Sequence, residues 1–299
     1  MAVTAPNRKT ARMSDLSNAV VVVTGGATGI GLALAREAVN RGAKVMIADI
    51  DDATAAVDEL REVGGDAASV VADISNIEDV RRLANATVER FGEVNVVCNN
   101  AVFAVPGTLQ ETAPELAGRM VRVNVEGAIN IVHVFAPFLR DAATAGRPSY
   151  LLNTGSEHSL GVPPHVEPFS VYTTTKFATL GLTLTAHRDL ADWGVGVSML
   201  APGWTLTEKV QAAVDADPAV AQAILPFAQE SSIVAAKAYD GLLGGTRVIA
   251  TNPFSRAFAM EHARALMIDV QELPLVEAPG EHAHDGSGDV GACPFMGAR

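Results

Sequence analysis

The chain alternates short, continuous apolar runs with longer segments of helical periodicity. The runs, beginning with AVVVVTGG at 19–26, place β-branched residues at consecutive positions. Such runs are typical of strands that are buried on both faces of a parallel sheet. The segments between them, such as GIGLALAREAVNRGA at 29–43, repeat apolar residues at helical spacing and end near glycine. The pattern therefore predicts strands joined by crossover helices.

This alternation continues along most of the chain. It predicts an α/β fold in which a doubly wound parallel sheet of about seven strands carries helices on both faces. The expected strands lie at 19–26, 44–50, 67–75, 94–101, 148–156, 194–203 and 246–251. The expected helices occupy 29–43, 52–65, 76–92, 112–139, 170–192, 206–229, 231–243 and 252–270.

A single catalytic domain over 18–272 is the simplest organisation, because no polar linker interrupts the alternation. Residues 1–17 are polar, and we expect a flexible N-terminal segment there. Residues 273–299 lack periodicity and are rich in Gly, Pro and acidic residues, which predicts a loosely ordered tail. His282 and His284 in this tail are weak evidence for a metal, and we expect none.

Charge and cysteine content narrow the classes of partner. The net charge of −12 opposes a nucleic-acid footprint and a polybasic membrane patch. The apolar runs are too short to cross a bilayer, and no apolar region of a signal peptide follows the N-terminus. The two cysteines, Cys98 and Cys293, form neither a disulfide framework nor a metal quartet. We therefore expect a cytoplasmic protein with a small-molecule partner.

The first strand runs into a glycine-rich turn, TGGATGIG at 24–31, which precedes an amphipathic helix. Glycine allows a tight turn and a close approach of backbone to phosphate, and a helix N-terminus offers free N–H groups. A plain strand-to-helix turn is the alternative. The flanking strand and helix favour a dinucleotide-binding turn.

The second strand ends at Asp49, about twenty residues after the glycines. A carboxylate there accepts hydrogen bonds from both hydroxyls of an adenosine ribose and repels a 2′-phosphate. No Arg or Lys lies in GGATGIG or directly after Asp49. The pattern favours NAD over NADP. The alternative, a helix N-cap acid, is better filled by Asp51 or Asp52.

The segment SVYTTTKFATLG at 170–181 places Tyr172 one helical turn before Lys176. Such a pair can move protons, because a nearby ammonium favours the phenolate. The same spacing also arises by chance as an ordinary surface pair. The motifs elsewhere in the chain are needed to distinguish a proton-transfer pair from a surface pair.

Further short motifs accompany the glycine turn and the Tyr–Lys pair, over about residues 19–210. They are Asp73 and Ile74 in ADIS, Asn100 and Ala101 in CNNAV, Asn124 in RVNVEG, Ser156 in LNTGS, and Pro202, Gly203, Thr205 and Thr207 in APGWTLT. Together with Thr24, Gly25, Gly29 and Gly31, they resemble the motifs of the short-chain dehydrogenase/reductase family, in a member with an extended C-terminus. Val102 departs from the glycine that this family carries after Asn-Asn-Ala, and the interval from Ser156 to Tyr172 is longer than usual.

The resemblance implies a Rossmann-type fold and a site for hydride transfer to or from NAD. Tyr172 would be the general acid/base, Lys176 would favour its phenolate and hold the nicotinamide ribose, and Ser156 would orient the substrate oxygen. Asn124 would hold a water that links Lys176 to solvent. The implied cofactor-binding residues are Thr24, Gly25, Thr28, Gly29, Ile30, Gly31, Asp49, Asp73, Ile74, Asn100, Ala101, Tyr172, Lys176, Pro202, Gly203, Thr205 and Thr207. Family members form homodimers or homotetramers through two long helices, here 112–139 and 170–192.

The expected substrate pocket is apolar and has no Arg or Lys to hold a carboxylate or phosphate. It comprises Val102, Phe103, His158, Leu160 and Trp204. This set favours a hydrophobic secondary alcohol or its ketone. His158 and His165 lie in the loop before Tyr172 and could contact the substrate, although their loop position favours solvated histidines.

Two other functions stay open. An NADP-dependent β-ketoacyl-type reductase would prefer basic residues for a carrier protein, which the negative net charge opposes. A non-catalytic, NAD-binding regulatory protein on the same fold would typically lack the tyrosine or the lysine, and this chain has both.

Overall fold

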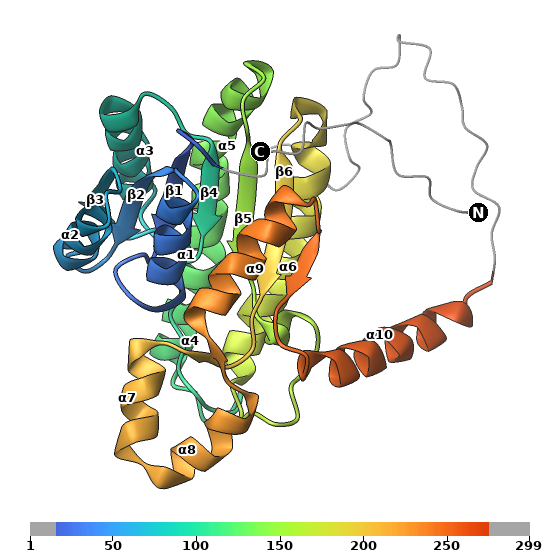
Figure 1. Ribbon diagram of the computed structural model, residues 1–299. Helices are drawn as coiled ribbons and strands as arrows, with labels where there is room; N and C mark the ends of the chain where they lie inside the picture. The colour runs from blue at the N-terminus through green and yellow to red at the C-terminus, as the bar shows by residue number, and fades with distance from the viewer. Residues whose placement is uncertain (1–15, 275–299) are drawn as a thin grey trace. The chain divides into compact units, whose positions relative to one another are not determined.

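The computed structural model describes residues 16–274, and a seven-stranded parallel sheet forms its centre (Figure 1). The strand order β3-β2-β1-β4-β5-β6-β9 reverses direction at β1 and β4, as in a doubly wound sheet. Strands β1 and β2 pair with Val20 opposite Lys44. The bounds are β1 Val20–Thr24, β2 Lys44–Asp49, β3 Ala67–Val71, β4 Val96–Asn99, β5 Tyr150–Thr154, β6 Gly196–Ala201 and β9 Val248–Ala250. The predicted fold class is confirmed.

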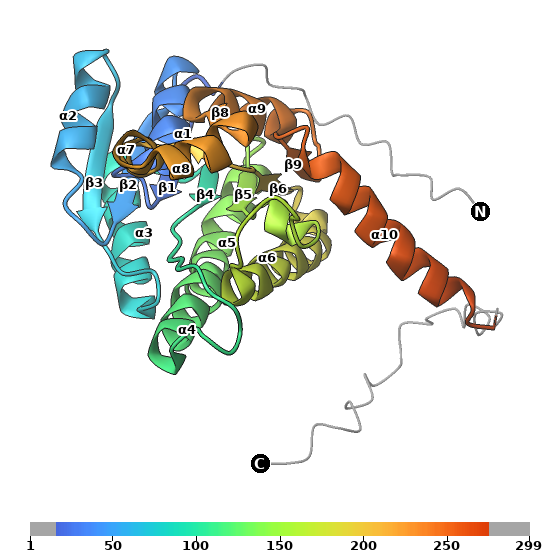
Figure 2. The same cartoon turned by 90° about the horizontal axis from the view of Figure 1, so that it is seen from below.

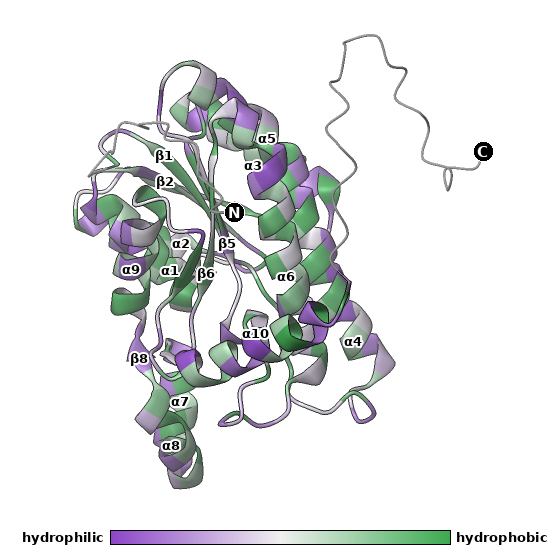
Figure 3. Ribbon diagram, turned by 90° about the vertical axis from the view of Figure 1, so that its right-hand side faces the viewer, coloured by the Kyte–Doolittle hydropathy of each residue, from purple (hydrophilic) through white to green (hydrophobic). Residues whose placement is uncertain are grey.

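Helices cover both faces of this sheet (Figure 2). One buried apolar cluster joins β1 to helices α1, α2 and α9. The other joins the opposite face to α3, α5 and α6. Strand β1 is hydrophobic along its length, whereas α3 and α9 show both hydrophobic and hydrophilic residues (Figure 3). The bounds are α1 Gly29–Asn40, α2 Thr54–Glu62, α3 Ile77–Phe91, α5 Ala128–Thr144, α6 Ser170–Asp189 and α9 Ser231–Leu243.

The helix expected at 112–139 is interrupted. Helix α4, Pro114–Val121, is followed by a π-helical turn, Arg122–Gly127, before α5 begins at Ala128. A single π-helical turn inserts a residue into a helix, and such turns are frequent at functional sites. Asn124 lies within the turn, so the interruption falls on a predicted site residue.

The helix expected at 206–229 is also divided. Helix α7, Glu208–Ala216, ends before Asp217, whose side chain caps α8, Pro218–Ile224. Proline at the first position of α8 begins a helix readily but cannot continue one. Two short strands, β7 Thr205–Leu206 and β8 Gln229–Glu230, flank this helix pair and bond to each other. The two helices lie beyond the carboxyl ends of the central strands (Figure 1).

The ends of the described chain bear on the predicted domain limits. Leu16 is fully buried, and its N–H donates to the carbonyl of Arg41 at 3.0 Å, so it is part of the core. Helix α10 spans Ser255–Gln271, and the contacts divide the chain into a compact unit that ends at Met260 and a second that begins at Glu261. The predicted tail beyond 274, with His282, His284 and Cys293, lies outside the described residues. No helix between residues 16 and 274 is long and apolar enough to span a membrane.

Candidate active site

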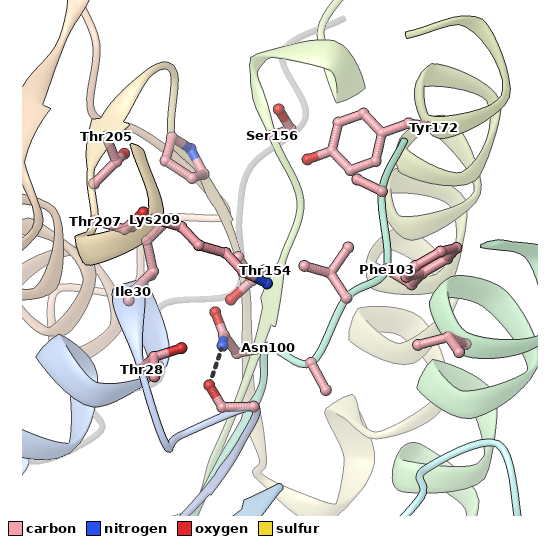
Figure 4. A pocket seen from close by; sticks show the side chains of 18 of the residues that line it. Thr28, Ile30, Asn100, Phe103, Thr154, Ser156, Tyr172, Thr205, Thr207 and Lys209 are labelled. Atoms are coloured by element: carbon pink, nitrogen blue, oxygen red, sulfur yellow. Dashed lines mark hydrogen bonds between the residues drawn. The ribbon is translucent and has the colours of Figure 1, made fainter. Parts of the chain in front are cut away.

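A cleft of about 620 Å³ opens at the carboxyl ends of the parallel strands. It is lined at one end by the glycine turn after β1 and at the other by Ser156, Tyr172 and Lys176 (Figure 4). Ligands of doubly wound sheets bind at this edge, where the strand order reverses. The cleft therefore joins the predicted dinucleotide turn to the predicted proton-transfer pair.

The turn after β1 depends on glycine for its shape. Gly25 and Gly29 have φ of +63° and +62°, values that favour glycine. A Cβ on Gly31 would lie 1.9 Å from the carbonyl oxygen of Gly25. The turn thus brings the start of α1 against the backbone of the preceding strand. It leaves an open cradle that side chains would fill.

Thr24 and Asn100 fasten this turn to the end of β4. The Thr24 hydroxyl accepts from the backbone N–H groups of Asn100 and Ala101 at 2.9 and 3.0 Å. The Asn100 amide donates to the carbonyls of Thr24 and Gly25 at 3.0 and 3.3 Å. Asn100 and Ala101 line the cleft, whereas Thr24 is buried behind it. Thr24 therefore positions the cradle and does not face it.

Asp49 and Asp73 lie at the ends of neighbouring strands and both line the cleft. Asp49 accepts from the N–H of Ala27 at 2.9 Å and from the N–H of Asp51 at 3.2 Å. Asp73 accepts from the Ser75 backbone and hydroxyl at 2.9 and 2.7 Å. These bonds fix both carboxylates in place and keep them at the cleft surface. The other predicted cofactor residues that line the cleft are Thr28, Ile30, Ile74, Pro202, Gly203, Thr205 and Thr207.

The N-terminus of α1 already holds an anionic group. Glu208, from α7, accepts from the N–H of Gly29 at 2.8 Å. Its carboxylate stands in for a phosphate oxygen at the free N–H groups of a helix N-terminus. The buried hydroxyl of Thr154, which lines the same cleft, has no hydrogen-bond partner among the described residues. The glycine cradle, the anion position and this unpaired hydroxyl fit a dinucleotide.

Ser156, Tyr172 and Lys176 converge at the other end of the cleft. The Tyr172 hydroxyl points toward Ser156 in Figure 4. The Lys176 ammonium donates to the carbonyl of Thr154 at 2.7 Å and lies 5.4 Å from the centre of the Tyr172 ring. Ser156 comes from the turn after β5, and Tyr172 and Lys176 come from α6, as the motif spacing predicts.

The proton affinities in this group are governed by burial. Burial raises the pKa of Tyr172 to about 12, although the hydrogen bond with Ser156 opposes the rise. Burial also lowers the pKa of Lys176 to about 7. The sequence led us to expect a phenolate favoured by the lysine. In the protein alone, removal of water instead disfavours both charged forms, so Tyr172 holds its proton at neutral pH.

Asn124 lies behind the cleft and does not line it. Its amide accepts from the N–H of Phe103 and donates to the carbonyl of Phe103, both at 2.8 Å, and donates to the Thr175 hydroxyl at 3.1 Å. It therefore clamps the loop after β4 to helix α6. The proposed water link to Lys176 remains a prediction.

The two histidines of the loop between Ser156 and Tyr172 are packed rather than solvated. His158 is 7% exposed, and its ring lies 5.3 Å from that of Tyr172. His165 stacks on Phe227 at 4.7 Å, and its Nε2 lies 3.4 Å from the carboxylate of Glu157. Burial raises the pKa of Glu157, although its hydrogen bond from Ser255 opposes this. The expectation of solvated loop histidines is wrong, because His158 packs against Phe169 and Tyr172, and Phe227, which is far along the chain, covers His165.

The lining of the cleft differs in part from the expected substrate pocket. Val102, Phe103, His158 and Trp204 line it, but Leu160 does not. Besides Lys176, two cations that the sequence analysis did not name, Arg119 and Lys209, line the cleft. Arg119, from α4, lies 4.2 Å from the centre of the Phe103 ring, and Lys209 extends into the cleft from α7 (Figure 4). Both residues lie outside the sequence motifs described above, so no local sequence pattern indicated that they would line the cleft.

Comparisons with known proteins identify the family of the chain. A family model described as short chain dehydrogenase matches residues 19–218. The 2,5-dichloro-2,5-cyclohexadiene-1,4-diol dehydrogenase of Sphingobium indicum is 36% identical over 208 residues, which cover 69% of this chain and 80% of that protein. The 1-deoxy-11-beta-hydroxypentalenate dehydrogenase of Streptomyces exfoliatus is 35% identical over 200 residues, which cover 66% of this chain and 70% of that protein.

A solved structure extends the likeness through most of the fold. A short-chain dehydrogenase/reductase from Burkholderia phymatum, in complex with NAD, matches with a TM-score of 0.75 and 28% identity. The match covers 89% of this chain and 99% of that one. The family model covers well over half of the chain, and the sheet order and cleft agree with it. The chain therefore belongs to the short-chain dehydrogenase family and is an oxidoreductase.

Proposed function

We propose that the protein is an NAD-dependent oxidoreductase that interconverts a hydrophobic secondary alcohol and its ketone. The observation that carries the proposal is the convergence of Ser156, Tyr172 and Lys176 at one end of a cleft whose other end is the glycine turn. The two curated relatives are named as dehydrogenases of a cyclohexadienediol and of a hydroxypentalenate. Their names support a carbon-bound hydroxyl as the reacting group.

In this proposal the protein supplies position and proton transfer. A nicotinamide bound in the cleft supplies the hydride chemistry. Ser156 donates a hydrogen bond that orients the substrate oxygen, and the Tyr172 hydroxyl gives a proton to that oxygen during ketone reduction or takes one during alcohol oxidation. Because the pKa of Tyr172 is raised to about 12, the protonated phenol is ready to act as an acid at neutral pH. Alcohol oxidation requires the phenolate and is therefore favoured by alkaline pH.

Lys176 would control the charge beside this phenol. A protonated ammonium lowers the energy of a phenolate, while a neutral amine does not. With a pKa of about 7, Lys176 changes charge near neutrality in the protein alone. Hydroxyls of a bound ribose would add acceptors for its ammonium and favour the charged form. Cofactor binding would then raise the pKa of Lys176 and prepare Tyr172 to lose its proton.

The preference for NAD rests on Asp49. Its carboxylate is fixed at the cleft surface by the N–H groups of Ala27 and Asp51, and a 2′-phosphate beside it would be repelled. Asp49→Ala should relax the preference, measured as the ratio of kcat/KM for NAD to kcat/KM for NADP. A wild-type protein that already prefers NADP would contradict the proposed cofactor and would favour the β-ketoacyl-type alternative.

A direct test is the absorbance of reduced nicotinamide with a panel of hydrophobic alcohols, run with NAD and NADP in parallel. The proposal predicts turnover of at least one secondary alcohol with NAD. Binding of NAD without turnover of any alcohol or ketone in the panel would instead favour a regulatory NAD-binding protein.

We also propose that the protein is cytoplasmic and forms a homodimer or homotetramer through the segments at 112–139 and 170–192.

A further inference from the structure

His158 lines the cleft beside the proton-transfer group, and among the described residues only its Nδ1 has a hydrogen-bond partner. Its imidazole lines the cleft and meets the Tyr172 ring nearly edge-on, at 5.3 Å between centres and an interplanar angle of 75°. The ring is buried, and its other aromatic neighbour is Phe169, at 6.3 Å. A polar side chain enclosed between two aromatic rings keeps a fixed orientation. Its free hydrogen-bonding atom is therefore a fixed feature of the substrate end of the cleft.

The hydrogen bonds of Thr173 decide which nitrogen of His158 carries the proton. The Thr173 hydroxyl lies 2.8 Å from Nδ1 of His158 and also 2.8 Å from the carbonyl oxygen of Phe169. The hydroxyl has a single proton, and two oxygens this close repel each other unless a proton lies between them. The proton therefore goes to Phe169, and Nδ1–H of His158 donates to Thr173. This tautomer is assigned from the network of hydrogen bonds.

Nε2 of His158 is then an acceptor with no proton of its own. Burial, together with the nearby His165 and Lys176, lowers the pKa of His158 to about 4, so the ring stays neutral at neutral pH. The groups at this end of the cleft have different hydrogen-bonding capacities. Ser156 and Tyr172 can donate to a reacting oxygen, whereas Nε2 of His158 can only accept. The carboxylate of Glu157 is already engaged by Ser255 and His165.

Val102, Phe103 and Trp204 provide the apolar lining of the cleft. Arg119, beside Phe103, can only donate, so an acceptor among these apolar side chains and donors selects a ligand that has a hydrogen-bond donor at that place. A ligand without such a donor would displace water from Nε2 and leave this nitrogen without a hydrogen bond. The lost hydrogen bond disfavours the binding of that ligand. Because the rings of His158 and Tyr172 are in contact, the donor would have to lie on a carbon close to the reacting one.

We infer that His158 is a specificity-determining residue and that the substrate is a hydrophobic diol, or the corresponding hydroxyketone, whose second hydroxyl donates to Nε2 of His158. The inference rests on the proposed function, because the first hydroxyl is the one that Tyr172 and Ser156 would hold. An imidazole that only packs against Tyr172 would give no preference for a second hydroxyl.

The test compares the vicinal diol of tetralin with the mono-alcohol that keeps the benzylic hydroxyl and lacks the second one. The expected ratio of kcat/KM, diol over mono-alcohol, is about 10- to 100-fold for the wild type, the range for leaving a buried acceptor unpaired. In His158→Phe the ring is kept and the acceptor is lost, so the ratio should fall to about one. In His158→Gln a side-chain oxygen can accept at similar reach, so part of the preference should return.

Two further variants separate recognition from folding. Thr173→Val removes the partner that fixes the tautomer, so Nε2 can carry the proton and the ratio should fall although the imidazole remains. His133→Phe makes the same substitution at an exposed position of α5 and should keep the wild-type ratio. A wild-type ratio near one, or a ratio unchanged in His158→Phe, would overturn the inference while leaving alcohol oxidation intact. No turnover of either alcohol by the wild type, with NAD or NADP, would instead count against the proposed function.

Discussion

Adding the same methyl group to two helical glycines should have opposite effects. In α1, a Cβ at Gly31 would lie 1.9 Å from the carbonyl oxygen of Gly25, about 1.5 Å short of an ordinary contact. It would also lie 2.8 Å from the amide nitrogen of Asn100, so neither neighbour can yield without moving the turn. In α6, a Cβ at Gly181 would meet no atom of the described residues within 4 Å. The methyl group added at Gly31 would be overpacked, whereas the one added at Gly181 would meet no steric clash.

The magnitudes follow from these contacts. Gly31→Ala should lower the free energy of unfolding by about 1–3 kcal/mol, because the backbone has to shift to accept the methyl group. The shift of the turn should also weaken dinucleotide binding, because the N–H groups of the cradle move with it. Gly181→Ala should raise the free energy of unfolding by about 0.5–1 kcal/mol, since alanine loses less backbone entropy than glycine in a helix interior.

Urea denaturation gives the free energies, and titration with reduced dinucleotide, followed by its fluorescence, gives the dissociation constants. Gly181→Ala is the matched control, because it adds the same atoms to a helix without touching the turn. Gly31→Ala with wild-type stability and wild-type dinucleotide affinity would refute the packing of the turn as described. Equal losses of stability in both variants would show that the helices, and not the turn, respond to the methyl group.

Two further predictions concern charge in the cleft. Glu208→Gln removes the anion that accepts from Gly29, so dinucleotide affinity should rise by about two- to five-fold, as isothermal titration would measure; weaker binding would mean that Glu208 aids the cofactor. Burial lowers the pKa of Lys176 to about 7, so between about pH 7 and pH 10.5 the unfolded chain binds a proton that the native amine lacks. Wild-type stability should therefore rise with pH relative to Lys176→Met, by at most about 1.4 kcal/mol per pH unit, in urea denaturation without cofactor. If the free energies of unfolding of the wild type and Lys176→Met changed with pH in parallel, Lys176 would be charged in the native state.

The sequence predicted the parts of the fold that local pattern determines. The consecutive β-branched residues of β1 form a strand that is buried on both faces, and the glycine spacing places the turn at its end. The interruption of 112–139 was missed, because the π-helical turn depends on the bonds of Asn124 to Phe103 and Thr175. Such bonds join segments that are distant in sequence. Helical periodicity alone gives no sign of them.

Site residues outside the motifs were missed for the same reason. Arg119 and Lys209 enter the cleft from helices α4 and α7, and only the folded chain brings these helices to the ends of the strands. The surroundings of His165 likewise depend on Phe227, which lies far along the chain. The spacing of Ser156, Tyr172 and Lys176 was informative because one strand end and one helix position all three.

The central claim is that Tyr172 transfers the proton, and Tyr172→Phe tests it most directly. Tyr150→Phe is the matched control, because it removes a hydroxyl from β5, outside the cleft lining. With the best alcohol of the panel and NAD, the formation of reduced nicotinamide should be slower in Tyr172→Phe by about 100- to 10,000-fold in kcat, while dinucleotide affinity changes little. Tyr150→Phe should retain the wild-type rate. Turnover by Tyr172→Phe at the wild-type rate would contradict the assignment of Tyr172 as the acid and base of this site.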